Sequence, residues 1–199
     1  MKKVFFKEFM FYVSKDVYEP AEDTFLLAEN VVVDKNDVVL DVGTGCGILG
    51  ILAAKKARMV VAVDVNPHAV CCAKMNAELN GVAEKMETLR SDLFKAIKKN
   101  VKFDLIIFNA PYLPSEILEE KNWIERAWAG GPTGRQLIDQ FILHAPSYLK
   151  KGGKILLIQS TLSDVEETTH KLRERQFYVR VLAQDKVAFE TMVVIEATL

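Results

Sequence analysis

The chain has 199 residues, half of them apolar, which is enough for one domain with a sizeable core. Its 26 Lys and Arg against 27 Asp and Glu leave a net charge of −1, so the composition predicts no broad basic surface for nucleic acid. No apolar run reaches the roughly 18 residues of a membrane span, and Cys46, Cys71 and Cys72 lack the spacing of a disulfide framework or a metal site. We therefore expect a single soluble, cytoplasmic domain over residues 1–199, without a metal and without a membrane partner.

Apolar, β-rich runs alternate with helical patterns along the chain. Strands are predicted at 37–42, 59–64, 85–90, 103–108 and 154–159, and then at 177–184 and 189–199. Helix starts lie between them. Asn66 precedes Pro67 at a first-turn position, and Thr133 with Gln136 and Ser163 with Glu166 have the spacing of capping boxes. The pattern predicts an α/β fold, a doubly wound and mostly parallel sheet that ends in an antiparallel hairpin.

The first polar motif is a glycine-rich turn between the strand at 37–42 and a helix that begins near Ile48. It reads Asp41-Val42-Gly43-Thr44-Gly45-Cys46-Gly47, and its glycines let backbone amides approach a ligand closely. The third glycine comes one residue too early for a dinucleotide fingerprint, and no Gly-Lys-Ser/Thr follows as in a phosphate-binding loop. The spacing therefore disfavours both NAD and ATP.

Acidic residues follow the next two strands. Asp64, with Val65 after it, ends a strand about 20 residues beyond the glycine loop, where a carboxylate can accept hydrogen bonds from both hydroxyls of a ribose. Asp92 follows the third strand, where it can accept from an adenine amine while Leu93 packs on the ring. Taken alone, Asp64 can equally be a helix cap or a solvated residue, and Asp92 an N-cap. Combined with the loop, these residues indicate an adenosine-bearing cofactor without phosphates.

A polar turn, Asn109-Ala110-Pro111-Tyr112, ends the apolar strand at 103–108. In a doubly wound sheet the ligand crevice lies at the carboxyl ends of the strands where the winding reverses, so this turn faces the glycine loop. Such a pairing suits S-adenosylmethionine, whose sulfonium methyl is already activated, so that the protein must chiefly aim a nucleophile. A plain turn-forming role for Asn109 and a packing role for Tyr112 remain alternatives.

At these motifs the chain resembles the class I S-adenosylmethionine-dependent methyltransferases, within them the amino-methylating group with an Asn-Pro-Pro-Tyr motif. Residues 17–31, VYEPAEDTFLLAENV, and 129–141, AGGPTGRQLIDQF, are similar to segments of the HemK-type release-factor glutamine methyltransferases of the short archaeal and eukaryotic kind. The resemblance covers nearly the whole chain. It implies a Rossmann-like, seven-stranded fold with strand order 3-2-1-4-5-7-6, in which residues 1–34 form a segment and helix over the cofactor site. Bacterial relatives carry an extra helical domain, and the short stretch before Val17 leads us to expect the subtype that lacks it.

The same resemblance implies roles for the site residues. The residues implied to bind S-adenosylmethionine are Thr24, Asp41, Gly43, Gly45, Asp64, Val65, Asp92, Leu93 and Asn109. Thr24 would meet the methionyl carboxylate, although helix capping is an alternative.

The resemblance also implies how the substrate nitrogen is held. The Asn109 side-chain oxygen and the carbonyl of Ala110 would accept the two hydrogens of a substrate NH2, while Tyr112 would pack on its plane. Ala110 stands where the family has its first Pro, but Pro111 restricts it to extended geometry, so the shape of the turn should survive.

The implied reaction is methylation of the side-chain amide nitrogen of a glutamine in a translation release factor. Adenine amines of DNA or RNA and a protein lysine are alternative substrates, but near-neutral charge argues against a dedicated nucleic-acid enzyme. A non-catalytic cofactor-binding subunit has only Ala110 in its favour.

Two further features concern partners. Residues 113–133 are long enough for a lid, with Trp123 and Trp128 either closing over substrate or packing a surface helix. The resemblance also implies a small zinc-binding activator protein that pairs with the edge strand near 85–90.

Overall fold

The structure is a computed structural model that describes residues 1–115, 122–187 and 189–199, and its elements follow the predicted alternation. The strands are β1 (Lys2–Phe6), β2 (Phe9–Val13), β3 (Val38–Val42), β4 (Met59–Asp64), β5 (Met86–Arg90), β6 (Phe103–Asn109), β7 (Leu149–Ser160), β8 (Tyr178–Val187) and β9 (Glu190–Thr198). The α-helices are α1 (Glu22–Glu29), α2 (Ile48–Ala54), α3 (Pro67–Leu79), α4 (Trp123–Trp128), α5 (Gln136–His144) and α6 (Val165–Glu174). Short 3-10 turns lie at η1 (Ala83–Lys85), η2 (Ala145–Tyr148) and η3 (Thr161–Ser163).

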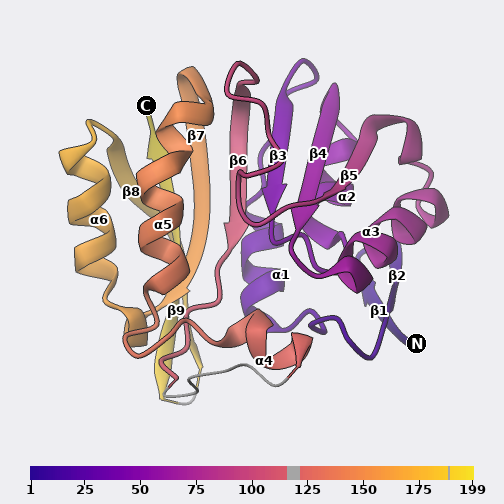
Figure 1. The fold of residues 1–199 in the computed structure, drawn as a ribbon, viewed down its shortest axis with the longest axis horizontal. Coiled ribbons are helices and arrows are strands. Elements are labelled where there is room, and N and C mark those ends of the chain that lie inside the picture. Colours follow the sequence, from indigo (N-terminus) through magenta and orange to yellow (C-terminus); the bar gives the residue numbers. More distant parts are fainter. Residues whose placement is uncertain (116–121, 188) are drawn as a thin grey trace.

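A seven-stranded sheet with the order β5-β4-β3-β6-β7-β9-β8 forms the centre of the molecule (Figure 1). Counted along the chain within this sheet, the order is 3-2-1-4-5-7-6, so the predicted doubly wound topology is confirmed. The neighbouring strands β5, β4, β3, β6 and β7 are all parallel. Strand β9 is antiparallel to both of its neighbours, β7 and β8. The winding reverses between β3 and β6, which places a ligand crevice at their carboxyl ends.

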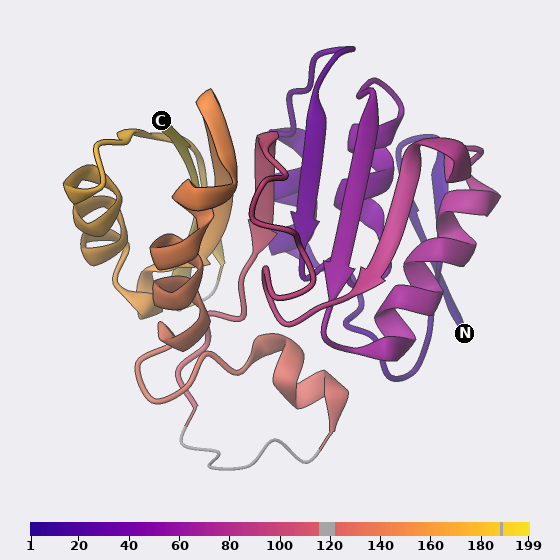
Figure 2. The ribbon, with the colours of Figure 1, turned by 45° about the horizontal axis from the view of Figure 1, so that its top comes forward.

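Burial explains why the central strands read as continuous apolar runs. Leu40 on β3 and Ile106 on β6 are fully buried, as expected for parallel strands that are covered on both faces. Helices α2 and α3 pack beside β3, β4 and β5, while α5 and α6 lie next to each other beside the β7-β9-β8 part of the sheet (Figure 2). Among the described residues, no helix is both long and apolar enough to cross a membrane.

The N-terminal residues form a β1–β2 hairpin that the sequence did not predict. Two side-chain amides hold it in place, one from α3 and one from the residue that follows this helix. Asn76 Nδ2 donates to the carbonyls of Tyr12 and Cys46, both at 2.8 Å, and Asn80 Nδ2 donates to that of Met10 at 2.9 Å. Asn76 therefore joins the hairpin to the glycine loop, in which Cys46 lies.

The helix starts confirm one prediction and correct two others. Asn66 caps α3, since its Oδ1 accepts from His68 N at 2.9 Å, as predicted. Both predicted capping boxes are wrong, because α5 begins only at Gln136, after Arg135, and α6 begins one residue later than predicted. Asp164 caps that helix and accepts from Glu167 N at 3.0 Å, with φ at +56°.

Candidate functional site

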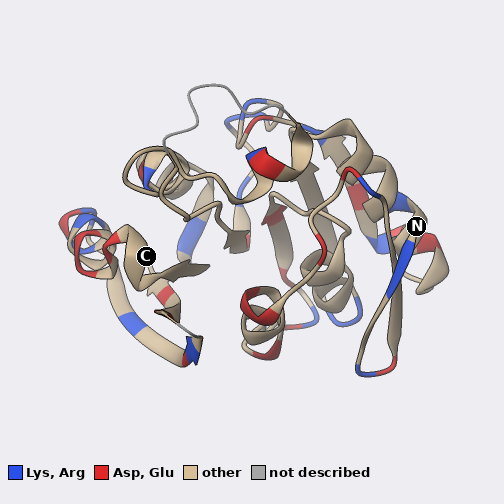
Figure 3. Cartoon of the chain, turned by 90° about the horizontal axis from the view of Figure 1, so that it is seen from below, with Lys and Arg blue, Asp and Glu red and all other residues tan. Residues whose placement is uncertain are grey.

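A cavity of about 430 Å³ lies at the carboxyl ends of β3, β4 and β6, the edge that Figure 3 views. Around this edge Lys and Arg are interspersed with Asp and Glu (Figure 3). The predicted site residues that line the cavity are Thr24, Gly43, Gly45, Asp64, Val65, Asp92, Leu93, Asn109, Ala110, Pro111 and Tyr112. Segments far apart in the sequence are thus brought together in a space of the size that small-molecule ligands occupy.

Asp41 is the one predicted cofactor ligand that does not line the cavity. It is fully buried behind the glycine loop, where its Oδ2 accepts from Thr44 Oγ1 at 2.6 Å and from Gly50 N at 2.9 Å. Burial raises the pKa of Asp41 to about 7, against these two hydrogen bonds, which lower it. The structure therefore assigns Asp41 to holding the loop, while Gly43 and Gly45, with φ of +67° and +57°, form the loop's exposed curve.

Asp64 presents a carboxylate with spare hydrogen-bonding capacity. Its Oδ2 accepts from Gly45 N at 3.0 Å and its Oδ1 from Asn66 N at 2.9 Å, which leaves a further acceptor site on each oxygen. Burial raises the pKa of Asp64, while these bonds and the nearby Arg126 lower it. A carboxylate in this position fits the two hydroxyls of a ribose.

The turn after β5 carries Asp92 and Leu93. Asp92 caps no helix in the described part of the chain, so the N-cap alternative is wrong, and its Oδ2 lies 2.6 Å from Lys95 Nζ. Leu93 has φ of +46°, a backbone conformation that a leucine adopts only at an energetic cost. Backbone strain of this kind concentrates at functional sites. Both residues line the cavity, as the predicted contacts with an adenine require.

The side chain of Asn109 is oriented by a cluster on α1. Asn109 Nδ2 donates to Asp23 Oδ2 at 3.1 Å and to Thr24 Oγ1 at 3.0 Å. Because a carboxylate only accepts hydrogen bonds, the amide nitrogen must face Asp23, and the amide oxygen faces away from it. The oxygen is thereby presented as an acceptor. Thr24 lies within α1 and does not cap it, which excludes the capping alternative.

Asp23 is a site residue that sequence reasoning missed. It lines the cavity, is only 4% exposed, and accepts from Tyr18 Oη at 3.3 Å and from Thr24 Oγ1 at 3.2 Å in addition to Asn109. Burial, and next the Asp23 charge, raise the pKa of both Tyr18 and Tyr112 above the ordinary tyrosine value. The only sequence signal was the pair Asp23-Thr24, and an acid in a first helical turn already has an ordinary explanation in the helix dipole.

The segment after Tyr112 returns to the cavity through α4. Trp123 and Trp128 both line the cavity, and the guanidinium of Arg126 lies 5.8 Å from the centroid of the Trp123 ring. Part of the predicted lid, residues 116–121, lies outside the described residues. Closure of the tryptophans over substrate stays a prediction. Among the described residues, no group of three or more His, Cys, Asp or Glu side chains could hold a metal ion.

Comparison with known proteins gives consistent matches. The family model for ribosomal protein L11 methyltransferase (PrmA) matches residues 24–121. A putative protein N5-glutamine methyltransferase of Methanocaldococcus jannaschii is 46% identical over 184 residues, which cover 92% of this chain and 91% of the relative. The human methyltransferase HEMK2 is 30% identical over 196 residues, with coverage of 92% and 90%.

A solved structure of similar fold comes from E. cuniculi. It is the Mtq2–Trm112 complex, described as responsible for methylation of the translation termination factor eRF1. The match has 27% identity and a TM-score of 0.71, and covers 92% of this chain and 98% of that chain.

Proposed function

Because this chain belongs to the HemK-type family of protein glutamine N5-methyltransferases, we propose that it transfers the methyl group of S-adenosylmethionine to the side-chain amide nitrogen of a glutamine in a translation release factor. A cytoplasmic location, where release factors act in translation termination, is part of the proposal. The observation that carries it is the orientation of Asn109, whose amide oxygen is held as an acceptor at the cavity by Asp23 and Thr24.

The cofactor fits the residues present. S-Adenosylmethionine supplies an electrophilic methyl group when it is bound. Gly43 and Gly45 allow its close approach to the loop, Asp64 has acceptor sites for its ribose, and Leu93 offers an apolar surface for its adenine. No Gly-Lys-Ser/Thr motif for phosphate follows this loop, in agreement with a cofactor that has no phosphates.

The turn at 109–112 would orient the substrate. The Asn109 Oδ1 and the Ala110 carbonyl accept the two hydrogens of the glutamine NH2, and Tyr112 packs on the amide plane. An amide nitrogen is a weak nucleophile because its lone pair is delocalised into the carbonyl. Two fixed acceptors favour the geometry in which that lone pair points at the methyl group, an effect of position and electrostatics.

The direct test is methyl transfer from labelled S-adenosylmethionine to a purified release factor with a Gly-Gly-Gln motif, with the site read by mass spectrometry. We expect the label on the glutamine nitrogen and none on a release factor in which that glutamine is replaced by glutamate. A DNA duplex bearing adenine and a lysine-containing protein are run in parallel. Better transfer to either, or no transfer to the release factor, would contradict the proposal.

Asp64→Ala should weaken binding of S-adenosylmethionine by about 1.5–3 kcal/mol, because two buried ribose hydroxyls lose a charged acceptor. Isothermal calorimetry measures the loss. Asp64→Asn keeps the size of the side chain and one acceptor oxygen, so its affinity for S-adenosylmethionine should lie between those of the parent protein and Asp64→Ala. Unchanged affinity in Asp64→Ala would remove this residue from the cofactor site.

We also propose a small zinc-binding partner protein that adds to the β5 edge. The proposal is supported by the Mtq2–Trm112 complex, and by the position of β5 as an unpaired edge on which Leu89 is 40% exposed. On co-expression, Leu89→Lys should abolish the heterodimer in size-exclusion chromatography. Val181→Lys, on the opposite edge strand β8, is the matched control and should leave it intact. Equal loss in both variants would place the partner elsewhere.

A further inference from the structure

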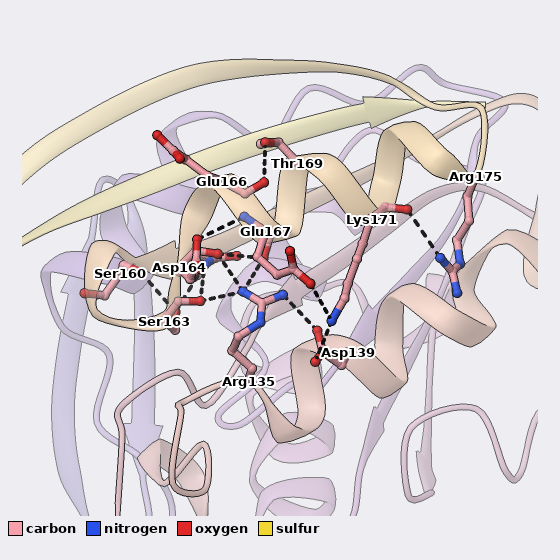
Figure 4. A network of polar contacts seen from close by, with 12 residues as sticks. Arg135, Asp139, Ser160, Ser163, Asp164, Glu166, Glu167, Thr169, Lys171 and Arg175 are labelled. Atoms are coloured by element: carbon pink, nitrogen blue, oxygen red, sulfur yellow. Dashed lines mark hydrogen bonds and ion pairs between the residues drawn. The ribbon is translucent and has the colours of Figure 1, made fainter.

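Arg135 carries a buried charge that the proposed mechanism does not use. Its side chain is 9% exposed, and both terminal nitrogens of its guanidinium have acceptors, while the buried Nε has none among the described residues (Figure 4). Nη1 donates to the carbonyl of Ser163 at 2.5 Å, to that of Asp164 at 2.6 Å and to Thr168 Oγ1 at 3.0 Å, while Nη2 donates to Asp139 Oδ1 at 2.8 Å. Burying a guanidinium is costly, and well-packed apolar residues often give equal stability, so stability alone explains such a residue poorly.

Gly134 connects the Ser163–Asp164 turn, which Arg135 binds, to the turn at 109–112. Gly134, the residue before Arg135, has φ of +71°. A Cβ atom on Gly134 would lie 2.2 Å from the carbonyl oxygen of Tyr112 and 3.0 Å from Cβ of Ser163. The backbone of Gly134 is thus wedged between Tyr112 on one side and the Ser163–Asp164 turn on the other.

A short ribbon extends this contact along the chain. Leu113 N donates to Trp128 O at 3.1 Å, Gly130 N donates to Leu113 O at 2.8 Å, and Gly134 N donates to Gly131 O at 3.0 Å. Asp23 of α1 therefore holds Asn109 at the end of β6. Beyond Tyr112, the chain is held by the backbone hydrogen bonds of this ribbon, which ends at Gly134 beside Arg135.

We propose that Arg135 is a positioning residue for methyl transfer, which holds Gly134 against the Tyr112 carbonyl and so fixes the turn at 109–112. The inference rests on the proposed function. A planar guanidinium reaches several acceptors in fixed directions, which the single ammonium of a lysine cannot do. Arg135 does not line the cavity, so in this proposal it acts only through the backbone.

The kinetic test compares two variants of the same network. Arg135→Lys should lower kcat for the release-factor glutamine by about tenfold or more, because small displacements of orienting groups have effects of this size. The dissociation constant of S-adenosylmethionine should not change, since the glycine loop and Asp64 are untouched. The control is Lys171→Met, which removes the ion pairs of Lys171 with Asp139 and Glu167 but no contact with the turn carbonyls, and should keep the parent kcat.

A second variant disturbs the same contact with the guanidinium intact. Gly134→Ala places a methyl group against the Tyr112 carbonyl and should reproduce the loss in kcat with unchanged cofactor affinity. If Arg135→Lys keeps the parent kcat, or if it loses cofactor affinity and kcat in parallel, the positioning role is wrong.

Amide hydrogen exchange tests the inference without methyl transfer. In Arg135→Lys the amides of Leu113 and Gly130 should exchange faster, while those of Thr44 and Gly50 in and behind the glycine loop keep their protection. Unchanged exchange at Leu113 and Gly130, or an equal rise at all four, would overturn the inference. A parent enzyme that does not methylate the release factor would instead overturn the proposed function, and the exchange rates would still report whether Arg135 holds the turn.

Discussion

Asn109→Ala should nearly abolish methyl transfer and leave the affinity for S-adenosylmethionine about unchanged. The substitution removes the amide oxygen that we propose accepts a hydrogen bond from the substrate nitrogen, while the glycine loop and Asp64 stay intact. Loss of one preorganised polar contact of this kind costs about 100-fold or more in kcat. Single-turnover transfer to the release factor gives the rate, and calorimetry gives the cofactor affinity.

Asn109→Asp separates the oxygen acceptor from its orientation. The carboxylate keeps oxygen acceptors but loses the NH2 group that donates to Asp23, and it faces a second carboxylate in a buried site. Repulsion should turn the new side chain away, so we expect a loss nearly as large as for Asn109→Ala. Near-normal transfer by Asn109→Ala would contradict the mechanism, and near-normal transfer by Asn109→Asp would show that Asp23 does not set the orientation.

The fold could be predicted because its signals are local. The central strands β3, β4 and β6 are compact apolar runs, and α3 has a recognisable start at Asn66 before Pro67. Topology then follows from the rules for parallel sheets. The β1–β2 hairpin was missed although Phe9, Phe11 and Val13 alternate with less buried residues. The run is short, and its placement depends on distant contacts with Asn76 of α3 and with Asn80, the C-cap of that helix.

The site was predictable where its residues follow strand ends and not where they depend on distant contacts. Asp64 and Asn109 stand at the carboxyl ends of β4 and β6, so the pattern of the sheet locates them. Asp41 occupies an equivalent place on β3, but its side chain turns back to the loop and α2. Asp23 lies 86 positions from Asn109, and no local pattern reports that pairing.

Ala110 stands where the family motif has proline, and the surrounding contacts keep the turn in shape. It is 3% exposed and lines the cavity between Asn109 and Pro111. Alanine in place of the family's proline removes a ring but keeps the backbone carbonyl, which is the group that the proposed mechanism uses. The turn does not rely on that ring alone, because Pro111 restricts Ala110 and the ribbon at Leu113 fixes the chain beyond it.

Asp23→Ala should lower kcat by about 10- to 100-fold with little change in cofactor affinity. Without the carboxylate, the amide of Asn109 loses one of its two acceptors and can rotate, so its oxygen no longer points reliably at the substrate. Glu22→Ala is the matched control, since Glu22 is the neighbouring acid of the same helical turn and is exposed. If a general effect of acids at the helix start were responsible, the two variants would behave alike.

The tyrosines provide a second measurement for Asp23→Ala that does not depend on turnover. A carboxylate disfavours a nearby phenolate, so its removal should lower the pKa of Tyr18 and Tyr112, although burial, the larger cause, keeps both above the ordinary value. Tyrosinate absorbance in an alkaline titration reads this change, and Glu22→Ala should have a smaller effect. A fall in tyrosine pKa together with a parent-like kcat would separate Asp23 from the orientation of Asn109. A fall in both the tyrosine pKa and kcat would show that the Asp23 carboxylate, which contacts Asn109, Thr24 and Tyr18, acts on the tyrosines and on the orientation of Asn109.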